Sequence, residues 1–151
     1  MPNDFYKDGL KFSCKRCSTC CRVTSGYVYL SQKDISNLVL ALNVDRNSFL
    51  QIYCRWVINW KGEEVLSLKE KSNKDCILWD NGCTVYSSRP LQCLAFPFWD
   101  SIIASEHNWE IAAGECPGMN TGELHLKMEI EKFIKLRECE PIINRVIGSD
   151  L

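Results

Sequence analysis

The sequence has no long apolar run and no cluster of basic residues. Its strongest apolar stretches, LVLAL and LAFPFW, fall well short of the roughly 20 residues that cross a bilayer as a helix, so we expect no membrane association. Lys and Arg number 18 against 19 Asp and Glu, a formal net charge of −1, so we expect no nucleic-acid partner. The polar start, MPNDFYKDGLKF, lacks the apolar core of a signal peptide, so we expect a cytoplasmic protein.

Motifs of common enzymes are also absent from the sequence. No H-E-x-x-H motif or pair of acidic residues identifies a catalytic centre, and no G-x-G-x-x-G motif identifies a nucleotide cofactor site. The two histidines, His107 and His125, stand alone, and we interpret both as surface or packed residues rather than as partners of a nucleophilic cysteine. Catalytic residues and enzymatic activity therefore stay open at this stage.

Cysteine, in contrast, is abundant, with ten in 151 residues. Four of them crowd the stretch KFSCKRCSTCCRV, at Cys14, Cys17, Cys20 and Cys21. In a reducing compartment so many thiols indicate metal or redox chemistry more often than a disulfide framework. The even count is also compatible with five disulfides, so the number alone does not decide.

The spacing of the first cysteines is typical of metal-binding loops. A C-x2-C pair lets one tight turn aim two thiolates at one ion, and this spacing serves zinc and iron–sulfur sites alike. The run C-x2-C-x2-C matches the first three cysteines of the bacterial ferredoxin motif, but Cys21 then follows at once, where a ferredoxin has three intervening residues. The distant pair Cys116-Pro117 is a candidate for the fourth ligand.

The neighbouring residues Cys20 and Cys21 have different predicted roles. Adjacent side chains of an extended chain point to opposite faces, so the two thiols do not readily bind one ion together. We expect one of them to join Cys14 and Cys17 at a metal, and the other to face a second metal or the downstream cysteines. One ligand beside one buried or reactive thiol, and a strained vicinal disulfide, are the alternatives.

Four further cysteines are conspicuous downstream. Two of them bracket Asn81-Gly82, a pair whose positive φ angles suit a tight hairpin turn. Together with the first four, they supply enough thiolates for two four-cysteine sites. They are Cys76, Cys83, Cys93 and Cys116.

The apolar and turn residues predict an α+β fold: one small domain over residues 1–151, with short β-hairpins, several helices and a cysteine-ligated metal centre. Ser31 and Asp34 are placed to cap a helix, and Asp45 to cap the next one. Pro90 fits the first turn of a further helix. The expected elements in this part are a strand at 27–30, helices at 31–42 and 46–54, and hairpins at 56–68 and 76–86.

The C-terminal third is predicted to be mainly one long helix. Residues 102–112 have an ambiguous pattern, for which our interpretation is a pair of strands. Asn120 and Glu123 resemble a capping box and predict a helix at about 121–140. Pro141 ends or kinks that helix.

Three stretches together resemble a known family. CKRCSTCC, then CILWDNGCTVYSSRPLQCLAFPF, then CPG are similar to the YkgJ-like cysteine-cluster family, which is described as a zinc- or iron-chelating domain. That family's pattern is CxxCxxCC, then a cysteine before a hairpin, then C-x-[IV]-Y-x-x-R-P-x-x-C-x-x-F-P. The resemblance covers roughly residues 12–118, and Ser18-Thr19 depart from a glycine common at that point. The matching residues are Cys14, Cys17, Cys20, Cys21, Cys76, Cys83, Tyr86, Arg89, Pro90, Cys93, Phe96, Pro97, Cys116, Pro117 and Gly118.

The resemblance implies metal bound by cysteine thiolates, without naming the metal. Flagellin lysine methylases carry a similar cluster, but they are much longer than this chain, so a methylase activity is not transferred. We expect the Arg89 guanidinium to hydrogen-bond a thiolate or a backbone carbonyl, with a salt bridge as the alternative. The implied ligands are Cys14, Cys17, Cys20, Cys21, Cys76, Cys83, Cys93 and Cys116.

Other apolar residues are interpreted as ordinary core. Cys54 and Cys139 fall outside the family pattern, on expected helices, and buried cysteine is a common small apolar residue. Four aromatic residues near the pattern are also expected in the core, with the shielding of a metal cluster from water as the alternative. They are Tyr86, Phe96, Phe98 and Trp99.

We favour an iron–sulfur cluster, such as [4Fe–4S], over zinc. The ferredoxin-like triple spacing, the cysteine–proline pair and the aromatic surroundings support a cluster, whereas four convergent cysteines with a structural role more often bind zinc. The expected function is a metal-binding module for redox or electron transfer. The alternatives are a metal-dependent enzyme, for example a methyltransferase-related one, and a structural zinc or metal-delivery protein. A protein partner stays open.

Overall fold

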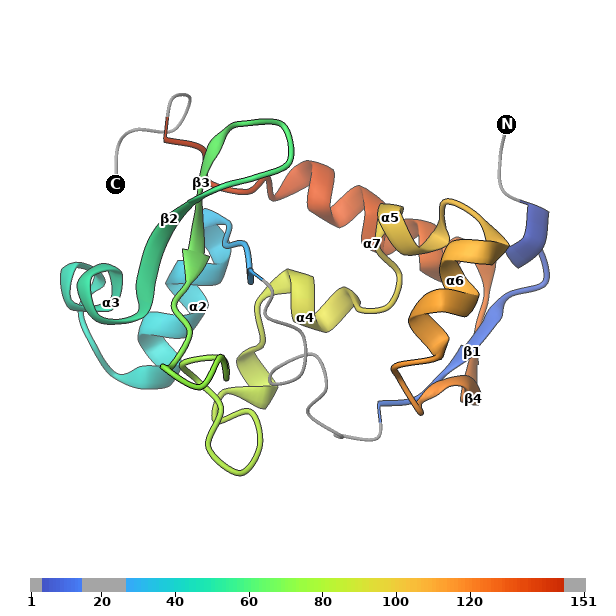
Figure 1. Cartoon of the computed structure of the whole chain (residues 1–151), viewed down its shortest axis with the longest axis horizontal. Coiled ribbons are helices and arrows are strands. Elements are labelled where there is room, and N and C mark those ends of the chain that lie inside the picture. Colours follow the sequence, from blue (N-terminus) through green and yellow to red (C-terminus); the bar gives the residue numbers. More distant parts are fainter. Residues whose placement is uncertain (1–3, 15–26, 146–151) are drawn as a thin grey trace. The chain divides into compact units, whose positions relative to one another are not determined.

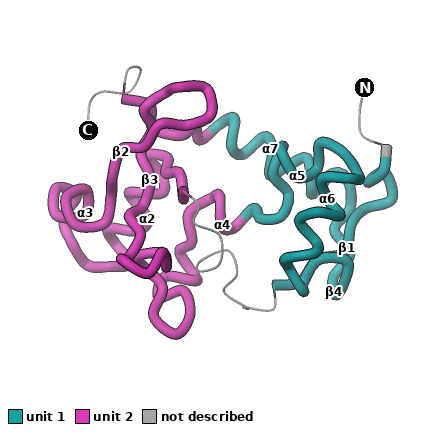
Figure 2. The backbone as a smooth tube through the Cα atoms, viewed as in Figure 1, with its two compact units in different colours: residues 1–19, 95–139 teal, residues 20–94, 140–151 magenta. Residues whose placement is uncertain are grey.

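The computed structural model of the chain describes residues 4–14 and 27–145 (Figure 1). Its contacts divide the chain into two compact units (Figure 2). Unit 1 comprises residues 1–19 and 95–139, and unit 2 comprises residues 20–94 and 140–151. The described residues form helices and two antiparallel two-stranded sheets, which confirms the predicted α+β class. That the whole chain acts as one domain stays a prediction.

Unit 2 begins, in its described part, with helix α2 (Gln32–Leu42). The predicted capping box is present: the Asp34 N–H donates to Ser31 Oγ at 3.1 Å, and the Ser31 N–H donates to Asp34 Oδ2 at 2.9 Å. The helix ends at Asn43, whose φ of 55° is the left-handed conformation of a helix C-terminus. The capping residues predicted from sequence therefore set the start of this helix.

Helix α3 (Arg46–Tyr53) and the hairpin that follows it are also as predicted. The Ser48 N–H donates to the Asp45 carboxylate at 2.8 Å, which caps α3. The chain then passes directly into β2 (Cys54–Ile58), which pairs with β3 (Glu64–Leu68). Cys54 is thus the first residue of a strand and not part of a helix.

An aliphatic core stabilises unit 2 from within. The fully buried residues at its centre come from α2, α3, β3 and the segments beside β3. The predicted strand at 27–30 is reduced to one bridge between Tyr29 and Ser67. The buried members include Leu30, Ile35, Leu38, Phe49, Leu66 and Ile143.

The predicted hairpin at 76–86 is a tight turn with almost no strand. Asn81 and Gly82 have φ angles of 56° and 133°, as the sequence predicted for the turn. The only bridge described within it joins Trp79 to Cys83. A 3-10 helix, η2 (Tyr86–Ser88), and the short helix α4 (Leu91–Ala95) follow. Pro90 therefore precedes α4 by one residue, close to the predicted position.

Unit 1 is built around stacked aromatic rings. Phe98 is 2% exposed, and its ring stacks on those of Trp109 and Phe133 with centroids 6.0 and 5.8 Å apart. Strand β1 (Leu10–Phe12) pairs antiparallel with β4 (Met119–His125). The remaining elements of the unit are η1 (Asp4–Tyr6), α5 (Asp100–Ile103), α6 (Glu106–Ala113) and α7 (Lys127–Cys139).

Two predictions for the C-terminal third are wrong. Residues 102–112 fold into helices α5 and α6, because Ser105 caps α6 through the Asn108 N–H and Trp109 anchors it in the core. The supposed capping box at Asn120 lies inside β4 instead. The side-chain oxygen of Asn120 accepts a hydrogen bond from the Trp109 indole at 2.9 Å. The long helix consequently starts at Lys127 and ends just before Pro141.

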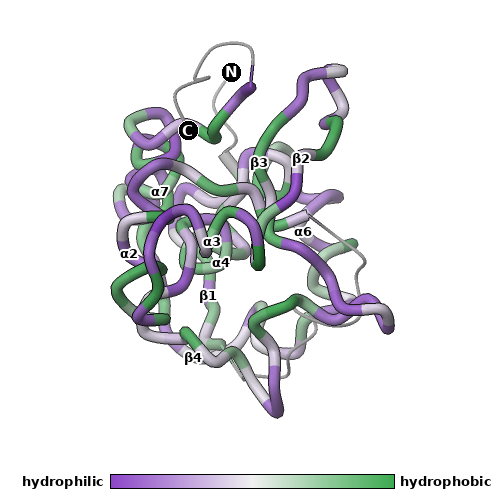
Figure 3. The backbone as a smooth tube through the Cα atoms, turned by 90° about the vertical axis from the view of Figure 1, so that its left-hand side faces the viewer, coloured by the Kyte–Doolittle hydropathy of each residue, from purple (hydrophilic) through white to green (hydrophobic). Residues whose placement is uncertain are grey.

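Hydrophobic stretches are short along the whole described chain. Figure 3 shows them interspersed with hydrophilic stretches along the tube. Among the described residues, no helix has the length and apolar character needed to cross a membrane.

Candidate metal centre

Five of the eight predicted ligands lie in the described part of the chain. Two belong to unit 1 and three to unit 2, whereas Cys17, Cys20 and Cys21 lie outside the described residues. No three Cys, His, Asp or Glu side chains within residues 4–14 and 27–145 are grouped so that they could hold a metal ion. The complete ligand set therefore stays a prediction. The five described cysteines are Cys14, Cys76, Cys83, Cys93 and Cys116.

In unit 1 the first and last motif elements are joined through Ser13 and Gly118. The Ser13 N–H donates to the Gly118 carbonyl at 3.2 Å, one residue from Cys14 and two from Cys116. A Cβ at Gly118 would lie 2.3 Å from the Ser13 carbonyl oxygen, so only glycine allows this approach. Gly118 of the CPG element thus allows two backbone segments to meet, one beside Cys14 and one beside Cys116.

In unit 2 specific polar contacts shape the turn between Cys76 and Cys83. The Trp79 N–H donates to the Cys76 carbonyl at 2.9 Å. Thr84 donates twice to the Leu78 carbonyl, from its N–H at 2.9 Å and its hydroxyl at 2.6 Å. Because few regular β-sheet hydrogen bonds join the two sides of the turn, these contacts determine the path of the backbone there.

Arg89 contacts Tyr86 in the short segment between the turn and the helix that carries Cys93. Its Nε–H donates to the Tyr86 carbonyl at 2.9 Å, and its guanidinium lies over the Tyr86 ring, 3.9 Å from the centroid. Of the predicted partners, the backbone carbonyl is the one observed. Arg89 therefore stabilises the bend that leads into α4.

Cys54 is a core residue, as predicted. It is 6% exposed, and burial raises the pKa of its thiol to about 12, although the charge of Lys69 acts in the opposite direction. Cys54 thus belongs to the buried apolar core of unit 2.

Cys139 is exposed, so its assignment to the core is wrong. The most deeply buried residue of α7 is Ile130. Nine residues separate the two, about 2.5 turns at 3.6 residues per turn, which places Cys139 on the opposite face of the helix. Helical spacing, read against Ile130, would have identified this exposure from the sequence.

His125, interpreted from the sequence as a surface or packed residue, makes two close contacts. Its Nδ1 lies 2.6 Å from the Glu129 carboxylate and its Nε2 lies 2.9 Å from the Phe12 carbonyl. Burial lowers the pKa of His125, but the hydrogen bonds to Glu129 and Phe12 and the charges of Glu129 and Glu123 outweigh it and raise the pKa above its usual value. Only the doubly protonated ring donates to both acceptors. His107, in contrast, is exposed on α6.

The aromatic residues near the motif divide between core and partial burial. Phe98 belongs to the buried core of unit 1, with Phe96 and Trp99 packed against it and Trp99 edge-on to Phe96 at 5.2 Å. Cys116 packs against the same core. The core assignment is therefore confirmed for Phe98, while Phe96 and Trp99 are partly buried at the edge of that core. Tyr86 is partly buried beneath the Arg89 guanidinium and belongs to neither core cluster.

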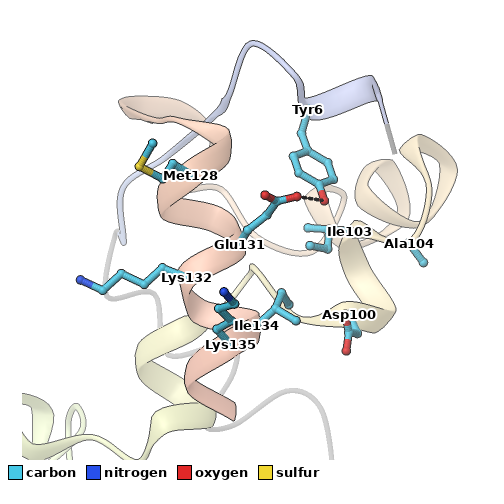
Figure 4. Close-up of a pocket in the computed structure, with 9 residues that line it drawn as sticks. All are labelled: Tyr6, Asp100, Ile103, Ala104, Met128, Glu131, Lys132, Ile134 and Lys135. Carbon is cyan, nitrogen blue, oxygen red and sulfur yellow. Dashed lines mark hydrogen bonds between the residues drawn. The ribbon is translucent and has the colours of Figure 1, made fainter. Parts of the chain in front are cut away.

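Unit 1 also has a surface pocket, lined by residues of η1, α5 and α7 and by Ala104. It encloses about 830 Å³ between η1, α5 and α7, and Figure 4 shows Glu131 pointing toward the Tyr6 hydroxyl. Tyr6 donates to that carboxylate at 3.5 Å, and burial followed by the charge of Glu131 raises the Tyr6 pKa. Charges of both signs, from Asp100 and Glu131 and from Lys132 and Lys135, line the pocket, and none of the five described cysteines does.

The donor atoms of the motif suit a soft metal. Thiolates are the ligands of tetrahedral zinc and of iron–sulfur clusters, whereas magnesium and calcium require oxygen. The eight motif cysteines would supply such thiolates.

Comparison with known proteins places the chain in a family. It is 30% identical over 98 residues to an uncharacterized protein of Methanocaldococcus jannaschii, an alignment that covers 63% of this chain and 49% of that protein. The chain thus spans about half the length of this curated relative. No solved structure matches the chain. A family model described as "CxxCxxCC: Putative zinc- or iron-chelating domain" matches residues 13–117, and the chain belongs to this family.

Proposed function

We propose that the chain is a redox or electron-transfer module that holds an iron–sulfur cluster through cysteine thiolates. The family description names zinc or iron. The observation that carries the choice of a cluster is the C-x2-C-x2-C spacing together with Cys116-Pro117, which shares the ligand spacing and the cysteine–proline pair of ferredoxins. One such cluster takes four cysteines, and the proposed ligands, enough for two clusters, are Cys14, Cys17, Cys20, Cys21, Cys76, Cys83, Cys93 and Cys116.

The protein's own residues orient the ligands in this proposal. A bound cluster would supply one-electron transfer. In unit 1, the Ser13–Gly118 contact fixes the backbone beside Cys14 and Cys116, and the aromatic core limits the access of water to Cys116. In unit 2, Arg89 fixes the bend before Cys93.

Zinc is the second candidate metal. Structural zinc sites are closed by four protein ligands, commonly cysteines, and the family description names zinc beside iron. Eight thiolates would suffice for two such sites. A zinc site would make the chain a structural or metal-delivery protein, and an open coordination position would make it a metal-dependent enzyme.

Serine substitutions test the ligand set. The Cys17→Ser and Cys83→Ser variants should each lose bound metal, because a serine hydroxyl does not replace a thiolate at a soft metal. Cys139→Ser is the matched control, since Cys139 is exposed and outside the motif, and it should keep its full metal content. Metal and sulfide are measured per chain after anaerobic purification. Full retention of metal in both Cys17→Ser and Cys83→Ser would overturn the assignment.

A further inference from the structure

The side chain of Gln92 bridges two backbone groups of the chain near β3. Its Oε1 accepts a hydrogen bond from the Tyr29 N–H at 2.9 Å, and its Nε2 donates to the Tyr27 carbonyl at 2.7 Å. One primary amide thus makes a donor and an acceptor contact with alternate residues of an extended segment. Gln92 occupies one of the unspecified positions of the family pattern, directly before Cys93.

The same helix is fixed on another side by a buried carboxylate. The Leu91 N–H, at the first residue of α4, donates to Asp34 Oδ1 at 3.0 Å, while the second oxygen of Asp34 accepts from Ser31. Asp34 is 3% exposed, so both contacts are sheltered from water. The start of α4 is therefore tied to the start of α2 as well as to Tyr27 and Tyr29.

These contacts matter because α4 is short. It spans five residues, and a helix of that length has almost no stability of its own. The orientation of its residues, Cys93 included, therefore depends on the bonds that hold its first turn. Leu91 and Gln92 supply those bonds immediately before Cys93 in the chain.

We propose that Gln92 is a positioning residue for metal binding, which orients Cys93 by tying α4 to the backbone of Tyr27 and Tyr29. The inference rests on the proposed function, in which Cys93 is a ligand. Residues that orient metal ligands through hydrogen bonds typically change metal affinity by about 10–100-fold when they are replaced. Asp34 assists from the other side, but it also caps α2, so its replacement would mix two effects.

The experiment compares four proteins: the wild type, Gln92→Leu, Gln92→Glu and the control Gln51→Leu. Gln51 is exposed on α3. Affinity for Zn²⁺ added to metal-free protein is measured by competition with a chelator. If the purified protein carries iron, the rate of iron release to a chelator is measured too. Urea unfolding and hydrogen exchange of the Tyr29 amide are recorded on the metal-free proteins.

Gln92→Leu should weaken Zn²⁺ binding by about 10–100-fold or speed the release of iron to a similar extent. Gln92→Glu keeps the acceptor for the Tyr29 N–H but loses the donor to the Tyr27 carbonyl, so it should fall between leucine and wild type. Exchange at the Tyr29 amide should accelerate in Gln92→Leu and stay nearly normal in Gln92→Glu. Gln51→Leu should match the wild type in every measurement.

Three results would overturn the inference while leaving the proposed function intact. The first is wild-type metal affinity and release in Gln92→Leu, and the second is unchanged exchange at Tyr29 in that variant. The third is a loss of unfolding free energy in metal-free Gln92→Leu as large as its loss of metal-binding free energy, which would make Gln92 a general stability residue. A wild-type protein that takes up neither zinc nor iron would overturn the proposed function itself, and this inference with it.

Discussion

Unit 1 and the segment of unit 2 that carries Cys76, Cys83 and Cys93 hold their cysteines by different means. In unit 1, Cys14 and Cys116 flank a strand pairing and an aromatic core centred on Phe98. In unit 2, residues 69–94 follow turns, a 3-10 helix and one short α-helix, joined by isolated backbone hydrogen bonds and by side-chain bonds to backbone groups. Leu78 and Val85 of this segment are buried in the aliphatic core, and Cys76 and Cys83 pack against that core. A strand pairing beside an aromatic core defines the first setting, and turns that reach the aliphatic core at a few residues define the second.

The difference indicates where a bound metal would add most to the fold. Buried apolar area stabilises a unit whether or not a ligand is present. A segment of turns closed by single hydrogen bonds gains only about 1 kcal/mol from each of them. We therefore expect residues 69–94 to depend on metal more than the aromatic core of unit 1 does.

The largest expected effect is that of metal removal. Chelation should lower the free energy of unfolding by an amount on the order of 10 kcal/mol if the metal organises its ligand loops. Exchange of the Thr84 and Leu94 amides should accelerate most, because their acceptors lie within residues 69–94. The Ile35 and Ile130 amides, in α2 and α7, should keep most of their protection.

Thermal unfolding and residue-resolved hydrogen exchange, with and without chelator, check this expectation. An unchanged thermal midpoint would contradict any structural role of the metal. Equal loss of protection at Thr84 and Ile130 would contradict the comparison of the two regions while leaving metal binding intact.

Replacement of Phe98 by alanine should cause the next largest loss of unfolding free energy. It removes a ring that is 2% exposed and stacked on Trp109 and Phe133, so the free energy of unfolding should fall by about 3–5 kcal/mol. The loss should be similar with and without metal, since it acts on packing. Urea unfolding of both forms measures it, and a loss below about 1 kcal/mol would show that the ring does not anchor unit 1.

Gly118→Ala should cost about 1–3 kcal/mol. The added Cβ would meet the Ser13 carbonyl oxygen at 2.3 Å, so the backbone beside Cys14 and Cys116 must move. Gly114→Ala is the matched control, because its φ is −63° and its Cβ would lie 3.3 Å from the nearest backbone oxygen. Urea unfolding and metal content are compared, and equal behaviour of the two variants would refute the role of the close approach.

The smallest effect concerns pH and His125. The pKa of His125 is raised in the folded protein, so its contribution to stability is fully present below the unfolded pKa of about 6.5 and is lost as pH rises through the folded pKa. Above that pH the neutral ring donates to only one of its two acceptors. The difference in unfolding free energy between wild type and His125→Gln should therefore shrink by roughly 1 kcal/mol with rising pH.

Urea unfolding between pH 5.5 and pH 9, at about half-unit steps across the ordinary histidine pKa, measures this difference. His107→Gln, at the exposed histidine on α6, is measured alongside for comparison. A difference for His125→Gln that grows as pH rises would contradict the sign derived from the contacts.

Local signals in the sequence predicted much of unit 2. Ser31, Asp34 and Asp45 cap helices where the sequence placed them, and Asn81-Gly82 form the expected turn. These devices act over three or four residues, so they can be recognised without knowledge of the fold. Their success reflects local chemistry that tertiary packing did not override.

In unit 2 the expected strands at 27–30 and 76–86 are reduced to single bridges. The predictions that named the wrong element lie mainly in unit 1, where distant contacts decide. Strand β4 forms because it pairs with β1, more than 100 residues earlier in the chain, and this pairing has no local signal. Asn120 looked like a cap, but the Trp109 indole takes its side-chain oxygen. The cysteine spacing predicted the family and the kind of donor, whereas the support from Gln92 and Asp34 depends on tertiary contacts.

The most direct test of the account is a metal and sulfide analysis, with an ultraviolet–visible spectrum, of anaerobically purified protein. The account predicts a brown protein that contains iron and sulfide and absorbs at about 400 nm. A colourless protein containing zinc would retain the cysteine site but contradict the cluster. A folded, stable protein with neither metal, unchanged by added zinc or iron, would contradict the central claim that these cysteines form a metal centre.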